Sequence, residues 1–548
     1  MNPLAPVALL LLGAAGCLLG LLRGFRYTGL LAAATAFAAV LATLMLGLRL
    51  PARMILSRWG PTALFPSGLR LAVDGMSWLL ALGLLLVVLA VALTGLARPG
   101  GRRVLPRAAG LVVVATALTA LFADSLVTLA ISWTALDAAA FITLVLLSAR
   151  EREYAPNGAA SRAVIGLGFN VLATVFVIAA ALESESAGAG ALLNAALLPD
   201  RAASFLIVAA VLRLNTFPVH FNVASEENLR SGIGTILRMA PIVVGIQLLA
   251  FVASRAPQLP FLGWWTAGAA AAVALGAVQW WSAPAPRQGL AYVALAHAGL
   301  MVLAALWSGP ATGAGVAAQG LALMSGGAVL FLYNGHDPTQ KAWAVVPVLA
   351  ATILAGLPLT VGFVGQWVTL GGLAAGSQWV VLVVVLLAQI PLMAGYLRLA
   401  FTPGESLPRG EPLVGVAYIF GLGAPLLFAG LTGLAPASIG ANAGGEVPGL
   451  FGLFRSNGLV AVIGVTLANL FGVGLWLVES RVREPTAEAW ETLVAMRLNW
   501  IYALAWDLYR VLRRALRAAA AILEGEGGVL WTLVLALLVW LAFGQSSA

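Results

Sequence analysis

Residues 202–221 read AASFLIVAAVLRLNTFPVHF, an apolar run that is long enough to enter a membrane and then turns polar. Arg213 and Asn215 follow the apolar part, Pro218 cannot continue a regular helix, and His220 comes two residues later. A helix that breaks inside a membrane exposes backbone groups that must face protein or water. The stretch therefore predicts a broken helix beside a polar cavity.

The rest of the chain has the composition of a polytopic membrane protein. Of its 548 residues, 61% are hydrophobic and 9% are charged, whereas a soluble domain carries about 25% charged residues. Counting one span for each apolar run of roughly 20 residues gives an all-α polytopic membrane fold with about sixteen transmembrane helices. The spans lie near 4–22, 27–48, 75–97, 108–123, 125–148, 163–182, 202–217, 232–253, 261–281, 288–307, 311–333, 343–372, 377–400, 413–434, 458–478 and 528–544.

A second span is interrupted in the same way. Residues 351–372 read ATILAGLPLTVGFVGQWVTLGG, where Pro358 and Gly362 are expected to break the helix. Two broken helices in corresponding positions indicate an internal inverted repeat. The predicted divisions are N-terminal transmembrane helices over 1–107, a first five-helix repeat over 108–253, a second, inverted five-helix repeat over 261–400, C-terminal transmembrane helices over 413–478, an amphipathic lateral helix over 485–526 and a final transmembrane helix over 528–548.

The lateral helix is predicted from the spacing of its arginines. Arg510, Arg513, Arg514 and Arg517 recur at helical spacing on one face, and leucine and valine side chains occupy the other. Such a helix lies along a membrane surface or along neighbouring helices. We therefore expect it to contact lipid or other membrane subunits.

The distribution of basic residues predicts the orientation. With the N-terminus outside, 21 of the 30 Lys and Arg residues fall on the inner side and seven on the outer side, which follows the positive-inside rule and places both termini on the outer face. The net charge of +9 is explained in this way, and no polar domain is present to bind nucleic acid. The single Cys17 and three scattered His residues form no metal-ligand cluster, and no cofactor motif is visible.

Four ionisable side chains fall inside predicted spans: Asp137, Arg213, Arg238 and His297. Burying such groups in a membrane is costly, so they usually face a partner or a polar cavity. We interpret them as a candidate proton or ion path. The alternatives are a neutral buried Asp137, arginines that only neutralise it or reach the membrane surface, and a His297 that serves as an ordinary helix contact.

Five passages carry a resemblance to a known family: VDGMSWLLALGLL (73–85), ISWTALDAAAF (131–141), LRLNTFPVHF (212–221), RQGLAYVALAHAGLMV (287–302) and GLPLTVGFVGQWVTL (356–370). Over residues 70–400 the chain resembles the antiporter-like membrane subunits of respiratory complex I, a family shared with Mrp antiporters and membrane-bound hydrogenases. The C-terminal part resembles the distal subunit of the complex, the subunit L or subunit 5 type of NADH:quinone oxidoreductase. The resemblance implies the two inverted repeats and their broken helices.

The resemblance also marks residues that depart from the family. Thr134 follows Trp133 where the family has Glu, and we expect Asp137, three residues on and on the same helical face, to replace that carboxylate. Arg213 occupies a family Lys position, and Arg238 aligns with a His. Two further family lysines fall at Gly327 and Gln366. Because Arg stays protonated in proteins, it cannot take over proton exchange from Lys.

These patterns favour a subunit of a complex I-like, redox-driven assembly that translocates protons or cations along an altered path. The membrane would be the energy-converting inner or plasma membrane of a bacterium or organelle. Any redox centre or cofactor of such an NADH:quinone oxidoreductase-like translocase would lie in partner subunits. Two alternatives remain open: a degenerate structural subunit that does not conduct, and a cation/proton antiporter or the membrane subunit of an inorganic-carbon uptake system.

Overall fold

The computed structural model describes most of the chain. The described residues are 2–22, 27–57, 68–96, 104–150, 159–193, 198–216, 232–255, 259–283, 285–333, 344–403, 412–454, 459–482, 499–524, 532–534 and 536–537. They fall into two compact units, Met1–Val478 and Glu479–Ala548. Each unit is described by itself.

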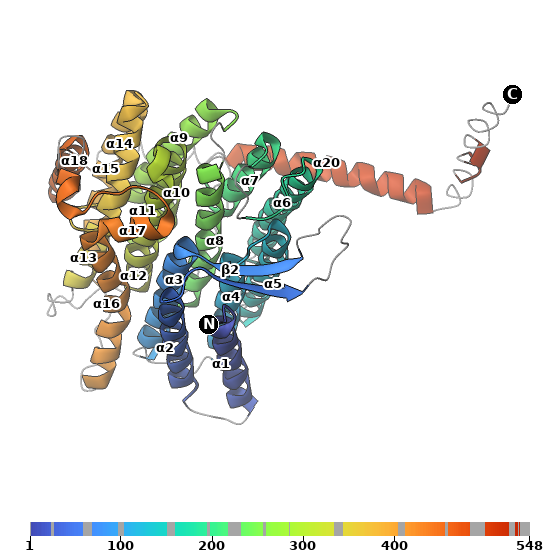
Figure 1. Ribbon diagram of the computed structural model, residues 1–548, viewed down its shortest axis with the longest axis horizontal. Coiled ribbons are helices and arrows are strands. Elements are labelled where there is room, and N and C mark those ends of the chain that lie inside the picture. The colour runs from blue at the N-terminus through green and yellow to red at the C-terminus, as the bar shows by residue number, and fades with distance from the viewer. Residues whose placement is uncertain are drawn as a thin grey trace. The chain divides into compact units, whose positions relative to one another are not determined.

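The first unit is a bundle of apolar helices (Figure 1). Its first half contains α1 (Ala5–Leu22), α2 (Thr28–Gly47), α3 (Gly75–Leu96), α4 (Val104–Leu121), α5 (Leu126–Arg150), α6 (Ala159–Ser186), α7 (Asp200–Arg213) and α8 (Ile233–Arg255). Its second half contains α9 (Leu262–Ser282), α10 (Pro286–Trp307), α11 (Thr312–Ala322), α12 (Ala328–Leu332), α13 (Val345–Leu354), α14 (Val361–Ala375), α15 (Trp379–Ala400), α16 (Pro412–Leu434), α17 (Pro436–Ala443) and α18 (Leu459–Leu477).

The described helices confirm the predicted class, an all-α polytopic membrane protein. Eleven of them are long and apolar enough to cross a membrane, and three shorter helices are also apolar. The total of sixteen spans stays a prediction, because nearly all of the last one, 528–544, lies outside the described residues. The limits of the two five-helix repeats also stay predictions.

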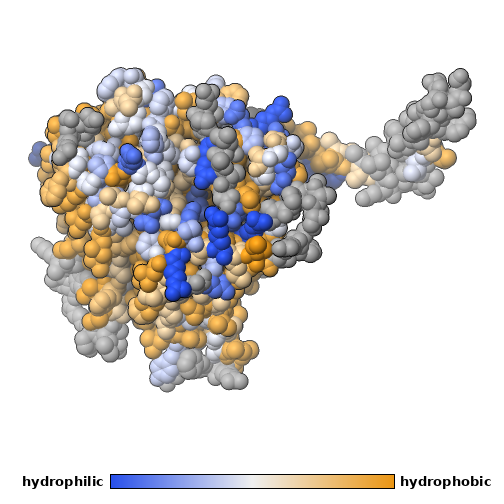
Figure 2. Space-filling view, in the orientation of Figure 1, coloured by the Kyte–Doolittle hydropathy of each residue, from blue (hydrophilic) through white to orange (hydrophobic). Residues whose placement is uncertain are grey.

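The centre of the bundle and its rim differ sharply in burial. In the span Gly309–Leu332, 100% of the 18 residues that form its apolar part are buried. In α6 and in α18, only 28% of the corresponding residues are buried. The exposed side chains of α6 include Val171, Leu172 and Val175. Figure 2 shows hydrophobic residues over much of the visible flank of the bundle, with hydrophilic residues gathered around the hairpin that follows α2. Apolar side chains on the rim suit a membrane or a neighbouring membrane subunit.

That hairpin is an element that the sequence did not predict. β1 (Ala52–Ser57) and β2 (Leu69–Val73) pair antiparallel, with Ala52 opposite Val73. The second edge of β2 is also used, because the Ala72 amide donates to the Phe122 carbonyl and the Asp124 amide donates to the Arg70 carbonyl. Strands of five or six residues in a segment between two apolar spans leave only a weak sequence signal. The pairing fixes the α4–α5 turn against the hairpin.

Helix α20 (Asn499–Glu524) belongs to the second unit. It forms the described part of the predicted lateral helix as one continuous stretch of 26 residues, about 39 Å long. Its apolar side chains are exposed, among them Leu508, Val511, Leu512 and Leu516. The segment 485–498 lies outside the described residues, and a binding role for the lateral helix stays a prediction.

Candidate functional site

Asp137 and Arg213 form an ion pair inside the first half of the bundle. Nη1 of Arg213, the last residue of α7, lies 2.5 Å from Oδ1 of Asp137 on α5. The side chains are 0% and 3% exposed, respectively. A buried pair is stable only if the two charges compensate each other closely, since removing both from water costs several kcal/mol per ion. The structure thus brings together two of the four predicted ionisable residues.

The pair leaves several of its polar atoms without a partner. Oδ2 of Asp137 and both Nε and Nη2 of Arg213 are buried and accept or donate no hydrogen bond to another described residue. The Arg213 guanidinium carbon lies 4.5 Å from the ring centroid of Trp133, whose own Nε1 is likewise unpartnered there. Most buried polar atoms in proteins are bonded. This group therefore retains hydrogen-bonding capacity in the middle of the bundle.

The helical phase of α5 explains which residues face the pair. Trp133 and Asp137 are four residues apart and therefore share one side of the helix, and both are buried. Thr134 is exposed, and its hydroxyl donates to the Ala130 carbonyl at 2.9 Å. Thr134 and Asp137 were expected to share a face of the helix, but Thr134 is exposed and Asp137 is buried.

The end of α7 positions Arg213. Helix α7 stops at Arg213, and Asn215 adopts a left-handed backbone with φ of 51°. A cation is favoured at a helix C-terminus, where the carbonyl ends are negative. Helix α8 closes the other side: a carbon added at Gly245 would lie 3.3 Å from the Arg213 Cβ. Pro218 and His220 lie outside the described residues.

Arg238 is placed apart from the pair. Its guanidinium carbon lies 4.1 Å from the ring centroid of Phe331 on α12, a cation–π arrangement. Asp137 accepts its hydrogen bond from Arg213, so Arg238 does not neutralise it. Arg238 is partly buried on α8 and takes no part in the hydrogen bond between Asp137 and Arg213.

His297 forms a second polar contact, in the centre of the bundle. On α10, its Nε2 lies 3.2 Å from the hydroxyl of Tyr396 on α15, and both side chains are buried. Gln319 on α11 interacts with the His297 ring, although Nδ1 of His297 and Nε2 of Gln319 do not reach hydrogen-bond geometry with any described residue. Tyr396 was missed at the sequence level, because a single Tyr in an apolar span carries no spacing signal.

The second break lies between α13 and α14, at Ala355–Thr360. Gly356 and Leu359 have φ of 64° and 74°, and the Thr360 hydroxyl accepts from the Phe363 amide to cap α14. Pro358 lies within the break, and Gly362 begins the next half-helix, where a Cβ would approach the Ile353 carbonyl oxygen to 1.9 Å. The break thus depends on a close backbone contact that only glycine permits.

Neutral amides surround this break. The carbonyl of Ala355, at the end of α13, accepts from Gln389 Nε2 at 2.7 Å and from Asn469 Nδ2 at 3.0 Å. The side chain of Gln366 lies against Gly356, and its Nε2 has no partner among the described residues. A buried helix-end carbonyl without a partner in its own helix needs another donor, and uncharged amides supply it here.

Gly327 leaves little room for a long side chain. It ends a π-helical segment, Leu323–Gly327, between α11 and α12. A carbon added there would lie 3.0 Å from Leu323 Cδ1 and 3.5 Å from Met239 Cε. Met239 and Leu323 therefore occupy the space into which a lysine at this position would extend.

We expect the amide pair on Ala355 to stabilise the break. Replacing both Gln389 and Asn469 by Leu leaves a buried carbonyl without a donor, which should lower the free energy of unfolding by about 1–3 kcal/mol. Either single replacement should cost less, because the other amide still donates. Thermal unfolding of the purified protein in detergent measures this, and equal effects of the single and double variants would contradict it.

Comparison with protein-family models and with curated protein sequences gives no match. Solved structures share the fold, among them chains of three membrane complexes. A chain of the Mrp complex from Dietzia sp. DQ12-45-1b aligns with a TM-score of 0.76 and 18% identity, over 100% of this chain and 63% of its own length. A chain of respiratory complex I from Thermus thermophilus aligns with a TM-score of 0.62 and 20% identity. The alignment covers 80% of this chain and 100% of the complex I chain. A chain of the archaeal membrane-bound sulfane sulfur reductase aligns with a TM-score of 0.72 and 16% identity. The alignment covers 99% of this chain and 100% of the reductase chain.

These likenesses confirm the predicted resemblance at the level of fold. The chain has the architecture of membrane chains found in Mrp, complex I and an archaeal respiratory complex. It spans 63% of the length of the Mrp chain. Fold by itself does not assign activity, which has to be argued from the site.

Proposed function

We propose that this chain is an antiporter-like membrane-arm subunit of a complex I-like assembly that translocates protons or cations along an altered path. The observation that carries the proposal is the fully buried Asp137–Arg213 pair at the end of the half-helix α7. Intramembrane ionisable residues usually mark ion or proton pathways. The fold likeness to three such multi-subunit complexes supports the same reading.

The pair can act as an electrostatic gate. Arg213 keeps its proton, so Asp137 is the member that can gain or lose one. The ionised Asp137 holds the guanidinium at 2.5 Å, while Trp133 supports it from the ring face. Protonation of Asp137 removes the attraction and frees a positive charge inside the first repeat. The charge then acts on neighbouring groups without any proton leaving Arg213.

His297 and Tyr396 extend the path into the second half. Imidazole can carry a proton on either nitrogen, and the tyrosine hydroxyl both donates and accepts. Their contact between α10 and α15 is the proposed relay step, and Gln319 of α11 adds a neutral hydrogen-bonding group beside the His297 ring. The proposed direction of charge movement is from the pair towards this relay.

The partners follow from the same proposal. Other membrane subunits of the assembly would contact the lateral helix 485–526 and the apolar rim, together with lipid. Redox centres would reside in those partners. The Arg distribution supports an energy-converting inner or plasma membrane with both termini on its outer face.

Replacing His297 by Gln tests the relay. We expect proton translocation by the assembly in sealed vesicles to fall at least tenfold, as is usual when a positioned acid–base group is removed. Tyr396→Phe should cause a smaller loss, because the imidazole remains. Equal turnover of the electron donor in all variants serves as the control. Unchanged translocation in His297→Gln would remove the relay from the proposal.

A second candidate is a structural subunit that does not conduct. The observation in its favour is that the polar side chains described around the second break, Gln366, Gln389 and Asn469, are uncharged amides. In that case the His297 variants would leave translocation unchanged, yet loss of the whole chain would dissociate the assembly. The same vesicle assay and a co-purification experiment separate the two candidates.

A further inference from the structure

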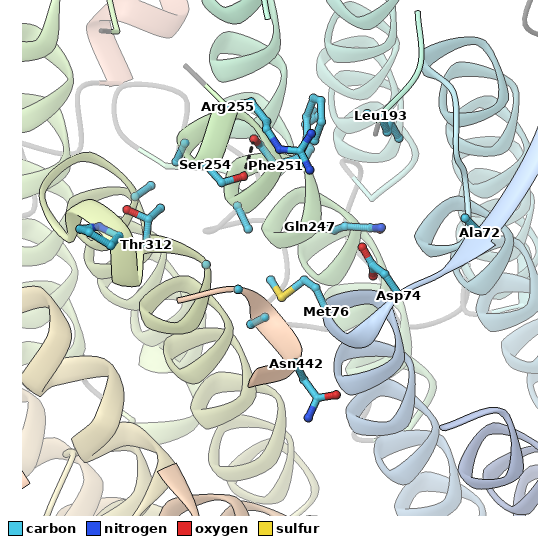
Figure 3. Close-up of a pocket in the computed structure, with 18 of the residues that line it drawn as sticks. Ala72, Asp74, Met76, Leu193, Gln247, Phe251, Ser254, Arg255, Thr312 and Asn442 are labelled. Atoms are coloured by element: carbon cyan, nitrogen blue, oxygen red, sulfur yellow. Dashed lines mark hydrogen bonds between the residues drawn. The ribbon is translucent and has the colours of Figure 1, made fainter. Parts of the chain in front are cut away.

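A large pocket opens beside the hairpin, on the face of the bundle where α8 ends. Its volume is about 940 Å³, and it lies between the hairpin, the α4–α5 turn, the C-terminal part of α8 and the starts of α3 and α11. Figure 3 shows the side chain of Gln247 directed towards Asp74, whereas Arg255 lies next to Phe251. We call this the hairpin pocket.

Asp124 is the most deeply buried acidic residue of the hairpin pocket. It is 7% exposed, and within the described part of the chain no donor bonds its carboxylate. The backbone holds it rigidly: its amide donates to Arg70, and its carbonyl accepts from the Leu193 amide at 3.0 Å. A buried carboxylate that lines a cavity without a bonded partner is unusual and points to a functional role.

The charges that face Asp124 act in opposite directions. Burial raises the pKa of Asp124 above that of an ordinary Asp, Arg53 of β1 and Arg70 of β2 oppose this rise, and Asp74 adds to it. Arg255 lines the same pocket, and Glu185 of α6 bonds the neighbouring Ala191 amide. The balance leaves Asp124 able to change protonation more readily than a fully paired carboxylate.

The hairpin pocket reaches towards the buried pair. Gln247 is the α8 lining residue farthest from Arg255, roughly 12 Å along the helix. Its Nε2 donates to the Leu121 carbonyl at 2.6 Å, and its Oε1 is buried without a partner among the described residues. Leu129 of α5 also lines the pocket, and Trp133, one helical turn further along the same face, packs against the Arg213 guanidinium. The pocket and the Asp137–Arg213 pair therefore share one face of α5.

We propose that the hairpin pocket is a water-filled vestibule in which Asp124 exchanges protons between the solution and the Asp137–Arg213 pair. This inference rests on the proposed translocation function and assigns to it the group that exchanges protons with the solution. Asp74 has a different task, because its Oδ1 accepts from the Ser77 amide at 2.8 Å and thereby caps α3. Asp124 has no such capping bond.

The test compares Asp124→Asn with Asp74→Asn. Asparagine keeps the shape of both residues and preserves the cap at 74. In vesicles containing the whole assembly, Asp124→Asn should slow proton translocation about tenfold and flatten its dependence on pH at the hairpin face. Asp74→Asn should keep translocation near the wild-type rate and only move its pH dependence to lower pH, because it removes a charge that raises the pKa of Asp124. Asp124→Glu should restore translocation. A purely structural Asp124 would give the same pH profile in wild type and Asp124→Asn.

Infrared difference spectra of the purified full chain provide an independent measurement. A protonated-carboxyl band should titrate above the ordinary Asp range and be missing in Asp124→Asn. Absence of this band from the wild-type spectrum overturns the vestibule. If Asp137→Asn stops translocation while Asp124→Asn does not, the vestibule is wrong and the proposed function stands. If the band titrates but neither variant changes translocation, Asp124 exchanges protons without serving the pair, which also overturns the vestibule.

Discussion

Asp137→Asn should abolish net ion translocation by the assembly and destabilise the chain. The substitution removes the charge opposite Arg213, which is 0% exposed and cannot give up its proton. Breaking a buried pair by deleting one partner typically costs about 3–5 kcal/mol, because the remaining charge is left uncompensated. Proton uptake in vesicles and thermal unfolding in detergent measure the two effects. Wild-type stoichiometry of protons per electron in Asp137→Asn would contradict the gate.

A double variant separates stability from conduction. Asp137→Leu combined with Arg213→Met removes both charges, and such replacements of a buried pair are often neutral or stabilising by about 1–4 kcal/mol. We expect the double variant to unfold at or above the wild-type temperature and still fail to translocate. If it translocates normally, the pair is only a packing element.

Arg213→Lys is the matched conservative variant. Lysine keeps the positive charge at the end of α7, and unlike arginine it can lose its proton when buried. We expect this variant to retain translocation, with a pH dependence that differs from wild type. The comparison tests whether a fixed charge, rather than a proton carrier, is what the first half requires.

The sequence predicted the elements that depend on long apolar runs and on proline. The all-α membrane class and the break at Pro358 follow from patterns that operate within one helix. Helix α7 ends at Arg213, earlier than the predicted span to residue 217. The pairing of Asp137 with Arg213 was one of several predictions that the sequence allowed. The arginine could also have reached the membrane surface, and Asp137 could have been buried in its neutral form. Only the contact of the Asp137 and Trp133 side chains of α5 with Arg213 of α7 decides among them.

What the sequence could not supply are contacts between distant segments. Tyr396 meets His297 across 99 residues, and Asn469 meets Ala355 across 114. The role of Asp124 depends on the unexpected hairpin, whose outer edge bonds the α4–α5 turn. The faces of α5 were also misjudged, because a separation of three residues leaves about 60° between Thr134 and Asp137. At the edge of a buried helix face, an angular separation of that size is enough for Asp137 to be buried while Thr134 is exposed.

The neutral surroundings of the second break define what that half can do. A lysine at position 366 would place its ammonium near the amide side chains that bond the Ala355 carbonyl. A lysine at position 327 would extend towards the Met239 and Leu323 side chains. Among the described residues, the buried ion pair of the bundle lies in the first half, at Asp137 and Arg213. The proposed route through the second half accordingly uses His297, Tyr396 and water rather than a lysine series.

Gly362→Ala should destabilise the chain strongly and disrupt the second break. The added Cβ would lie 1.9 Å from the Ile353 carbonyl oxygen, a backbone atom that cannot turn aside. Overpacking a well-filled interior costs typically 1–3 kcal/mol and occasionally more, and we expect about 3 kcal/mol or above because α13 and α14 must separate. Thermal unfolding in detergent, with protein yield as a second readout, measures the effect.

Gly371→Ala is the matched control on the same helix. Nothing lies within 4 Å of a Cβ added at Gly371, and alanine is the better helix former by about 1 kcal/mol. We therefore expect Gly371→Ala to keep or raise the unfolding temperature while Gly362→Ala lowers it. If both substitutions behaved alike, the close contact between the half-helices would not be what holds the break. The contrast isolates that contact because residue type, helix and substitution are the same.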